Sequence, residues 1–392
     1  MTVGVDATCW ANARGYGRFT RELLPAMAAA APEWRFRCFV DARAHAAFDL
    51  RAANVECVEV AQSVSPTSAA SADGNRSPVD MLRLTRAVAA HPSTVFFSPS
   101  VYTFFPLPPR IRSVVTIHDA IAERFPHLTL PSTRARLFWN AKVSLALWQA
   151  TTVLTVSDFA ASELVEVLGV DRRRVRVAVE APSPIYRPSE SAADVAEVAA
   201  RIGLPAGARW FTYVGGFSPH KNVHDLAEAH GRLLARLGDD TPWLVLVGAL
   251  SGDPFHGGQG QIREAIARAG SAARVLWPGF LSDADLRHLH SGAVALALPS
   301  MNEGFGLPAV EAAACGCPVV ATTASPLPQL LDGAGRFVPP GDVDGLTEAL
   351  AVLATDAPAR TRMADAARAR TSRLSWASCA RAALDALEEA AR

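Results

Sequence analysis

The most informative stretch lies in the last quarter of the chain and reads Ser300-Met-Asn-Glu303-Gly-Phe-Gly306-Leu-Pro308-Ala-Val-Glu311-Ala-Ala-Ala-Cys-Gly316-Cys-Pro318. It follows an apolar run at residues 293–298, which predicts a buried strand. Pro308 suits the first turn of a helix, and Gly316 suits the position just past its end. The stretch therefore predicts a strand, a glycine-containing loop and a helix. Glu303 precedes that helix, and Glu311 lies within it.

The start of this helix is also a predicted anion site. The N–H groups of Gly304, Phe305, Gly306 and Leu307 would point out of the helix start, where the helix dipole favours a phosphate-type anion. Glu311, on the first turns, is within reach of a sugar hydroxyl beside that anion. An anion site flanked by two carboxylates fits a nucleotide-sugar diphosphate. The alternative is an ordinary strand, turn and helix with surface acids.

A second glycine loop carries two basic residues. It follows the predicted strand at residues 212–214 and reads Gly215-Gly216-Phe-Ser-Pro219-His220-Lys221-Asn222, and a helix is expected to begin near Asn222 or the residue after it. A lysine held in such a loop can neutralise the negative charge that develops on a diphosphate leaving group. A solvated lysine in a turn is the alternative.

A histidine ends a predicted buried strand in the first half of the chain. The run at residues 114–117 is followed by His118 and Asp119. The carboxyl ends of parallel strands are where α/β sheets place their ligands, so His118 is a candidate ligand-contacting residue. Capping and packing roles are common for such a histidine and remain the alternative. Asp119 is expected to cap a turn or helix.

The first loop of the chain contains two glycines. Residues 13–18 lie between a predicted strand at 3–5 and a helix expected to begin at Phe19. Gly15 and Gly17 would let a ligand or another backbone approach closely. The loop lacks the G-x-G-x-x-G spacing of a dinucleotide-binding fingerprint.

Length and composition narrow the class of protein. The chain has 392 residues, which suggests two domains, and half of them are hydrophobic, which is enough for substantial cores. The formal net charge is zero, which argues against a general nucleic-acid binder. The six cysteines show no zinc-site spacing and no disulfide framework, and they fit a reducing cytoplasm. The sequence predicts no signal peptide and no membrane-spanning run.

Short apolar runs alternate with helical patterns along the chain, which is typical of parallel α/β units. We expect a first Rossmann-like domain over residues 1–188, a second over 189–372, and a final helix over 373–392. The proline-containing segment 180–188 serves as the connector between the halves. Residues 63–77 are rich in small and polar residues and are expected to form a surface loop.

The stretch 303–321 resembles the E-x7-E signature of retaining glycosyltransferases with two Rossmann-like domains, the GT-B fold, and in particular glycosyltransferase family 4. The resemblance implies two domains facing across a cleft, with the C-terminal helix crossing back to the first. It implies a retaining, metal-independent transfer of a hexose from a nucleotide-diphosphate sugar. The segment 219–222 leans toward mannosyltransferase-like members of polysaccharide or glycolipid assembly.

The resemblance also implies roles for individual residues. Lys221, Glu303 and His118 would be the catalytic group, and His118 would lie over the donor sugar. The remaining matched positions would bind the donor: Glu311 at the ribose, Gly304, Phe305, Gly306 and Leu307 at the diphosphate, Gly15 and Gly17 near phosphate and acceptor, and Phe280 in the nucleobase loop at residues 277–281.

One position departs from the family pattern. The resemblance also assigns Gly216 and His220 to donor binding. Members of the family usually carry an arginine where this chain has Gly216, and His220 is the candidate to supply the missing hydrogen-bond donor. If His220 takes that role, activity should depend on pH near neutrality. The missing arginine also keeps a noncatalytic donor-binding subunit open as an alternative, beside a sugar-nucleotide epimerase of the same fold.

The sequence motifs and the family resemblance also lead to expectations for cofactor, partners and cellular location. We expect no metal, because the two Asp-x-Asp pairs at 283–285 and 342–344 precede helical patterns and are expected to start helices. The partners are a nucleotide-sugar donor and a glycan, glycolipid or small-molecule acceptor, without nucleic acid. The segment 134–148 fits either a core helix or a membrane-docking surface, so the expected location is cytoplasmic, with peripheral contact at the inner face of the membrane as the second option.

Overall fold

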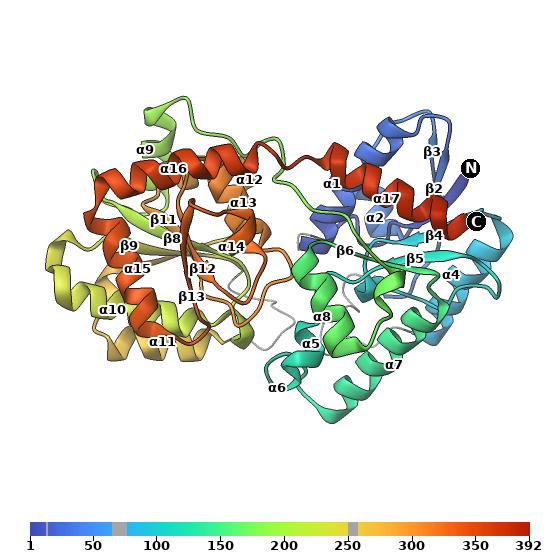
Figure 1. Ribbon diagram of the computed structural model, residues 1–392, viewed down its shortest axis with the longest axis horizontal. Helices are drawn as coiled ribbons and strands as arrows, with labels where there is room; N and C mark the ends of the chain where they lie inside the picture. Colours follow the sequence, from blue (N-terminus) through green and yellow to red (C-terminus); the bar gives the residue numbers. More distant parts are fainter. Residues whose placement is uncertain (13–14, 65–76, 250–257) are drawn as a thin grey trace. The chain divides into compact units, whose positions relative to one another are not determined.

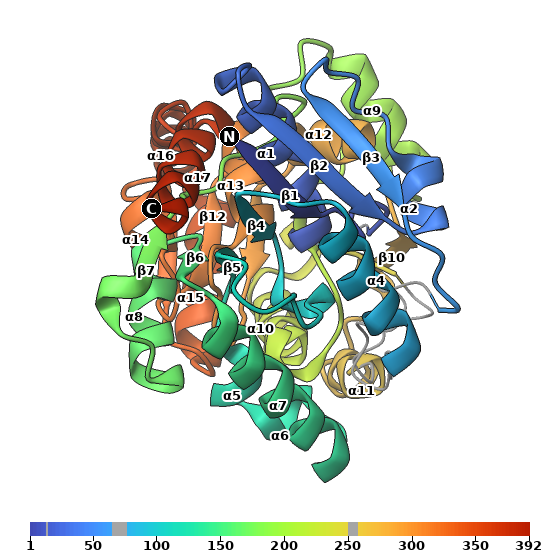
Figure 2. The same ribbon diagram turned by 90° about the vertical axis from the view of Figure 1, so that its right-hand side faces the viewer.

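The structure is a computed structural model that describes residues 1–12, 15–64, 77–249 and 258–392. The described chain forms two compact units, one of residues 1–180 with 375–392 and one of residues 181–374. Each unit is a parallel sheet covered by helices (Figures 1 and 2). Most of the expected loop at 63–77 and part of the first loop, residues 13 and 14, lie outside the described residues.

The first unit contains a seven-stranded sheet with the order β3-β2-β1-β4-β5-β6-β7, and every neighbouring pair is parallel. Its strands are β1 (Thr2–Asp6), β2 (Arg35–Val40), β3 (Val55–Glu59), β4 (Val95–Ser98), β5 (Ser113–Thr116), β6 (Thr152–Thr155) and β7 (Val175–Val177). The helices of this unit are α1 (Gly15–Ala30), α2 (Ala42–Ala47), α4 (Pro78–Ala90), α5 (Ile121–Arg124), α6 (Pro126–Thr129), α7 (Thr133–Gln149), α8 (Asp158–Leu168) and α17 (Trp376–Ala391). Strands β4, β5 and β6 are buried along their whole length, as expected for a sheet with both faces covered.

Helix α17 brings the C-terminal segment into the first unit. Trp376, Ala380, Leu384 and Leu387 recur at helical spacing along one face of it, and all four are buried. The helix packs on α1 and on strands β4 to β7. Ser375 caps its start by accepting a hydrogen bond from the Ser378 N–H.

The second unit contains a six-stranded parallel sheet with the order β10-β9-β8-β11-β12-β13. Its strands are β8 (Trp210–Val214), β9 (Trp243–Val247), β10 (Val275–Gly279), β11 (Ala295–Leu298), β12 (Val319–Thr322) and β13 (Gly335–Val338). Its helices are α9 (Ala192–Arg201), α10 (Val223–Leu237), α11 (Gln259–Arg268), α12 (Asp283–Gly292), α13 (Leu307–Ala314), α14 (Leu327–Leu330), α15 (Val343–Thr355) and α16 (Ala357–Thr371). The predicted strand, loop and helix of the opening stretch are β11 and α13.

Two sequence predictions were wrong in their boundaries. Helix α1 begins at Gly15 rather than at Phe19, so Gly15 and Gly17 lie in its first turn and not in a loop before it. The reason is the packing of that turn against the preceding segment, where a Cβ at Gly17 would come within 2.1 Å of the Asn12 carbonyl oxygen. Strand β10 runs to Gly279, so the predicted nucleobase loop begins later than expected.

The Asp-x-Asp pairs do start helices, as predicted. Asp283 and Asp285 lie in the first turn of α12, where the Ser282 hydroxyl accepts the Asp285 N–H at 3.2 Å. Asp342 is the N-cap of α15 and accepts the Gly345 N–H at 2.8 Å. Ser157 likewise caps α8, and Asp119 accepts the Ile121 N–H at the start of α5.

Candidate active site

The second unit has a topological switch point between β8 and β11. These strands are neighbours at the centre of the sheet, yet the chain runs from β8 toward β10 on one side and from β11 toward β13 on the other. The loops after such a pair of strands leave the sheet in opposite directions and open a crevice that α/β proteins use for ligands. The loop after β8 carries Lys221, and the loop after β11 carries Glu303.

Lys221 and Glu303 form an ion pair at this point. Lys221 Nζ lies 2.7 Å from Glu303 Oε1, and both side chains are mostly buried. The Ser300 hydroxyl donates to the same carboxylate oxygen at 2.6 Å. The fold therefore holds two residues that are 82 positions apart in direct contact. A ligand with an anionic group and hydroxyl groups could bind the Lys221 ammonium through the first and the Glu303 carboxylate through the second.

The two loops are also joined through their backbones. The Met301 N–H donates to the His220 carbonyl at 2.9 Å. Lys221 ends a short 3-10 turn, Pro219–Lys221, and Asn222 then adopts a left-handed conformation with φ of 55° before α10 begins. Asparagine tolerates that conformation better than most residues, and its side chain donates to Asp225 Oδ2 at 2.6 Å. This local chemistry fixes where the Lys221 backbone sits.

The start of α13 has the geometry that the sequence predicted. Gly306 is the N-cap, with φ of 85°, and Pro308 occupies the first turn. A Cβ at Gly306 would lie 2.8 Å from the Leu327 side chain, so both backbone conformation and space favour glycine here. The helix start therefore presents backbone N–H groups beside the loop that carries Glu303.

Glu311 lies on the second turn of α13 and is 5% exposed. Burial, with the negative charge of Glu311 as the second cause, raises the pKa of the Cys315 thiol to about 12. Cys315 and Cys317 are buried free thiols at the end of this helix. Gly316, with φ of 78°, occupies the left-handed position just past the helix end.

The other residues predicted for donor binding differ in their surroundings. Gly304, Phe305 and Leu307 are buried in the loop and first turn of α13. Gly216 is exposed after β8, and its carbonyl accepts a hydrogen bond from the Tyr213 hydroxyl. Phe280, just after β10, is 72% exposed, so its ring is open to a planar ligand.

His118 lies in the first unit, two residues after β5. Its side chain is 13% exposed, and its ring packs edge-on against Phe19 with centroids 4.9 Å apart. Neither ring nitrogen has a hydrogen-bond partner among the residues that the structure describes, and the nearest carboxylate oxygen, on Glu180, is 4.0 Å away. Burial lowers the pKa of His118 to about 4, so the imidazole is neutral near pH 7 and its nitrogens can bond a ligand hydroxyl.

The structure brings the predicted residues of the second unit together on two adjoining loops. Lys221, Glu303 and His220 lie on two adjoining loops of the second unit, while His118 and Gly17 belong to the first. The sequence reasoning assigned no role to Ser300, although it stands three residues before Glu303. A serine at the carboxyl end of a strand, close to a predicted catalytic acid, was the available signal.

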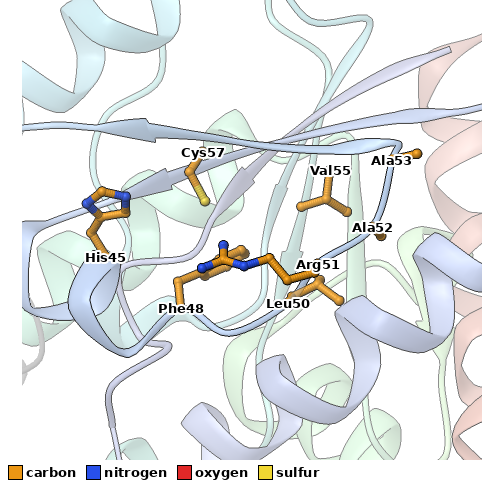
Figure 3. Close-up of a pocket in the computed structure, with 8 residues that line it drawn as sticks. All are labelled: His45, Phe48, Leu50, Arg51, Ala52, Ala53, Val55 and Cys57. Atoms are coloured by element: carbon orange, nitrogen blue, oxygen red, sulfur yellow. The ribbon is translucent and has the colours of Figure 1, made fainter.

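A cavity of about 450 Å³ lies elsewhere in the first unit, at the edge strand β3 (Figure 3). It is lined by α2, the loop that follows and β3, and the Arg51 guanidinium and the Cys57 sulfur both face it. None of the predicted site residues lines this cavity. It is therefore separate from the candidate active site.

Comparison with known proteins places these features in a class of enzymes. Residues 13–178 match the family model described as Glycosyltransferase Family 4, and residues 194–370 match the one described as Glycosyl transferases group 1. Sucrose-phosphate synthase from Thermosynechococcus elongatus has the same fold, with a TM-score of 0.75, 19% identity and coverage of 99% of this chain and 98% of that one. The fold is GT-B, as predicted.

Two relatives are similar in sequence. The O-antigen chain mannosyltransferase B of Escherichia coli is 29% identical over 73% of this chain and 71% of that protein. The D-inositol 3-phosphate glycosyltransferase of Saccharomonospora viridis is 31% identical over 66% of this chain and 60% of that protein. The aligned region thus spans 60% of the second relative's length and 71% of the first's.

The chain belongs to glycosyltransferase family 4, a family of retaining enzymes. It is a glycosyltransferase that takes a sugar from a nucleotide-sugar donor. Among the residues described, no helix is both long and apolar enough to cross a membrane.

Proposed function

We propose that this protein is a retaining, metal-independent hexosyltransferase that moves a hexose, such as mannose, from a nucleotide-diphosphate sugar to a glycan or glycolipid acceptor. The observation that carries the proposal is the contact between Lys221 and Glu303 at the switch point, beside the start of α13. The mannosyltransferase named among the relatives supports mannose as the first sugar to test.

The leaving group is handled by positive charge. As the bond between the anomeric carbon and the phosphate oxygen breaks, the diphosphate gains negative charge. Lys221 and the N–H groups at the start of α13 stabilise that charge, which lowers the barrier because they are in place before the reaction begins. The Lys221 ammonium therefore exchanges Glu303 for the diphosphate when the donor binds.

The acceptor hydroxyl then bonds to the anomeric carbon on the face from which the diphosphate leaves. Its proton passes to the departing phosphate oxygen, so configuration is retained and charge balances. Glu303 accepts a hydrogen bond from a donor-sugar hydroxyl and offsets positive charge that develops on the sugar ring. Glu311 binds the ribose hydroxyls, and His118 contacts the sugar as a neutral hydrogen-bonding group.

A second proposal concerns helix α7. Leu137, Phe138 and Trp148 on this helix are 69%, 56% and 79% exposed. The helix has three basic residues and no acidic one, and the guanidinium of Arg134 lies 5.4 Å from the centre of the Phe138 ring. Exposed apolar side chains close to cations could contact an anionic lipid surface, which suits a glycolipid acceptor.

The donor is tested by thermal-shift binding with GDP-, UDP-, ADP- and dTDP-linked mannose and glucose in the presence of EDTA. One nucleotide should raise the melting temperature, and NMR of the product should show the donor's anomeric configuration. An altered free sugar without acceptor would indicate an epimerase, and binding without turnover would indicate a donor-binding subunit.

Flotation with vesicles of anionic or zwitterionic lipid tests the proposal for α7. Trp148→Ala should weaken binding to the anionic vesicles.

A further inference from the structure

Ser300 makes the contact that the proposed mechanism leaves unexplained. Its side chain is fully buried at the carboxyl end of β11, and its hydroxyl donates to Glu303 Oε1 at 2.6 Å. Lys221 Nζ contacts the same oxygen at 2.7 Å. Within the described part of the chain, the two hydrogen bonds of the Glu303 carboxylate are therefore both to Oε1, not to Oε2. One carboxylate oxygen is thus doubly engaged, and the other is left for a ligand.

The contact is not a helix cap. Ser300-Met-Asn-Glu303 fits the S-x-x-E pattern of a capping box, in which the serine oxygen would accept the N–H of the glutamate. Here the Glu303 N–H donates instead to the Ala324 carbonyl at 3.1 Å, and α13 begins four residues later with Gly306 as its N-cap. The serine therefore acts on the side chain of Glu303 and not on a helix start.

We propose that Ser300 is a positioning residue that holds the Glu303 carboxylate when Lys221 turns to the diphosphate. This inference rests on the proposed function. Glutamate has several rotatable bonds, and loss of the Lys221 contact removes one of its two anchors. The Ser300 hydroxyl is the anchor that remains, because a hydrogen bond to a carboxylate is among the stronger ones available. It keeps Oε2 aimed at a donor-sugar hydroxyl and keeps negative charge beside the reacting carbon.

The first test measures equilibrium binding, so that it needs no turnover. Ser300→Ala should weaken binding of the sugar nucleotide about fivefold or more, while binding of the free nucleoside diphosphate changes less than about twofold. Ser300→Thr keeps the hydroxyl and should restore most of the loss. Equal affinity of wild type and Ser300→Ala for the sugar nucleotide would overturn the inference. Failure of the wild type to bind any sugar nucleotide would instead overturn the proposed function and this inference with it.

A double-mutant cycle with Glu303→Gln separates positioning from a merely structural effect. Because Ser300 acts through Glu303, Ser300→Ala should lower kcat about tenfold in the wild type and less than about threefold in the Glu303→Gln background. Fully multiplicative effects would show that Ser300 does not act through Glu303. The melting temperatures of all variants are measured alongside, and a Ser300→Ala variant that loses nucleoside diphosphate binding and stability together would also count against the assignment.

Discussion

His118 Nε2 lies 4.0 Å from Glu180 Oε1 in the first unit, too far for a hydrogen bond. Burial dominates the ionisation of the imidazole and lowers its pKa from 6.5 to about 4. Because this pKa is lower in the folded than in the unfolded protein, the stability it contributes is fully present above pH 6.5. It is lost as the pH falls from 6.5 toward 4.

The corresponding measurement compares the wild type with His118→Asn. The free energy of unfolding of the wild type relative to the variant should fall by about 2 kcal/mol between pH 7 and pH 5, because His118 protonates in the unfolded chain first. An NMR titration of the imidazole gives the pKa directly. A stability difference that stays the same at both pH values would contradict the neutral, desolvated histidine.

Lys221→Ala should lower kcat about 100-fold or more, because the charge that meets the leaving diphosphate is removed. Lys221→Arg keeps a positive charge and should lose less. The control is Arg232→Ala, which removes an exposed cation on α10 that pairs with Glu228 and Asp344. Normal turnover in a folded Lys221→Ala protein would show that another group stabilises the leaving group.

Glu311→Ala should weaken donor binding about tenfold and affect kcat less, because ribose contacts are made in the ground state and the transition state alike. Glu264→Ala on α11, an exposed position in the same unit, is the control. Since Glu311 is buried, the melting temperature is measured as well. Unchanged affinity for a nucleotide that binds the wild type would assign Glu311 to packing alone.

Gly17 and Gly15 form a matched pair in the first turn of α1. A Cβ at Gly17 would come within 2.1 Å of the Asn12 carbonyl oxygen, whereas a Cβ at Gly15 meets no described atom within 4 Å. Gly17→Ala should therefore destabilise the protein by roughly 2 kcal/mol or more, as overpacking does. Gly15→Ala should be neutral or stabilising by up to about 1 kcal/mol, because alanine favours helix. Chemical denaturation of both variants tests this, and equal effects would contradict it.

The alternation of short apolar runs with helical patterns predicted two α/β units because these patterns are local. Apolar runs marked most strands, and proline and glycine marked the ends of α13. Strands β7 and β13 are short and each contains an arginine, so neither forms an apolar run that a sequence pattern could mark. The start of α1 was misplaced because the close approach of Gly17 to Asn12 depends on packing that no pattern records.

The site was predicted in part for a related reason. The family resemblance predicted that Lys221, Glu303 and the helix start belong to one site, and the structure brings Lys221 and Glu303 into contact. Lys221 and Ser300 both donate hydrogen bonds to Glu303 Oε1. This shared contact depends on side-chain conformations, which sequence spacing does not determine. His118 and Glu180 lie close together although they are distant in the sequence. No pattern in the connector sequence predicted this proximity.

Gly216 stands where the family pattern predicts an arginine, so a substitution there tests whether this chain binds the diphosphate without one. The residue is exposed in the loop after β8, the same loop that carries His220 and Lys221, so we expect a long side chain there to extend into solvent. Gly216→Arg should tighten binding of a nucleoside diphosphate about threefold to tenfold, because a guanidinium binds phosphate oxygens in pairs. Calorimetry at two salt concentrations checks the electrostatic origin, with Gly216→Gln as the uncharged control. Equal affinities of wild type and Gly216→Arg would mean that the diphosphate does not lie against this loop.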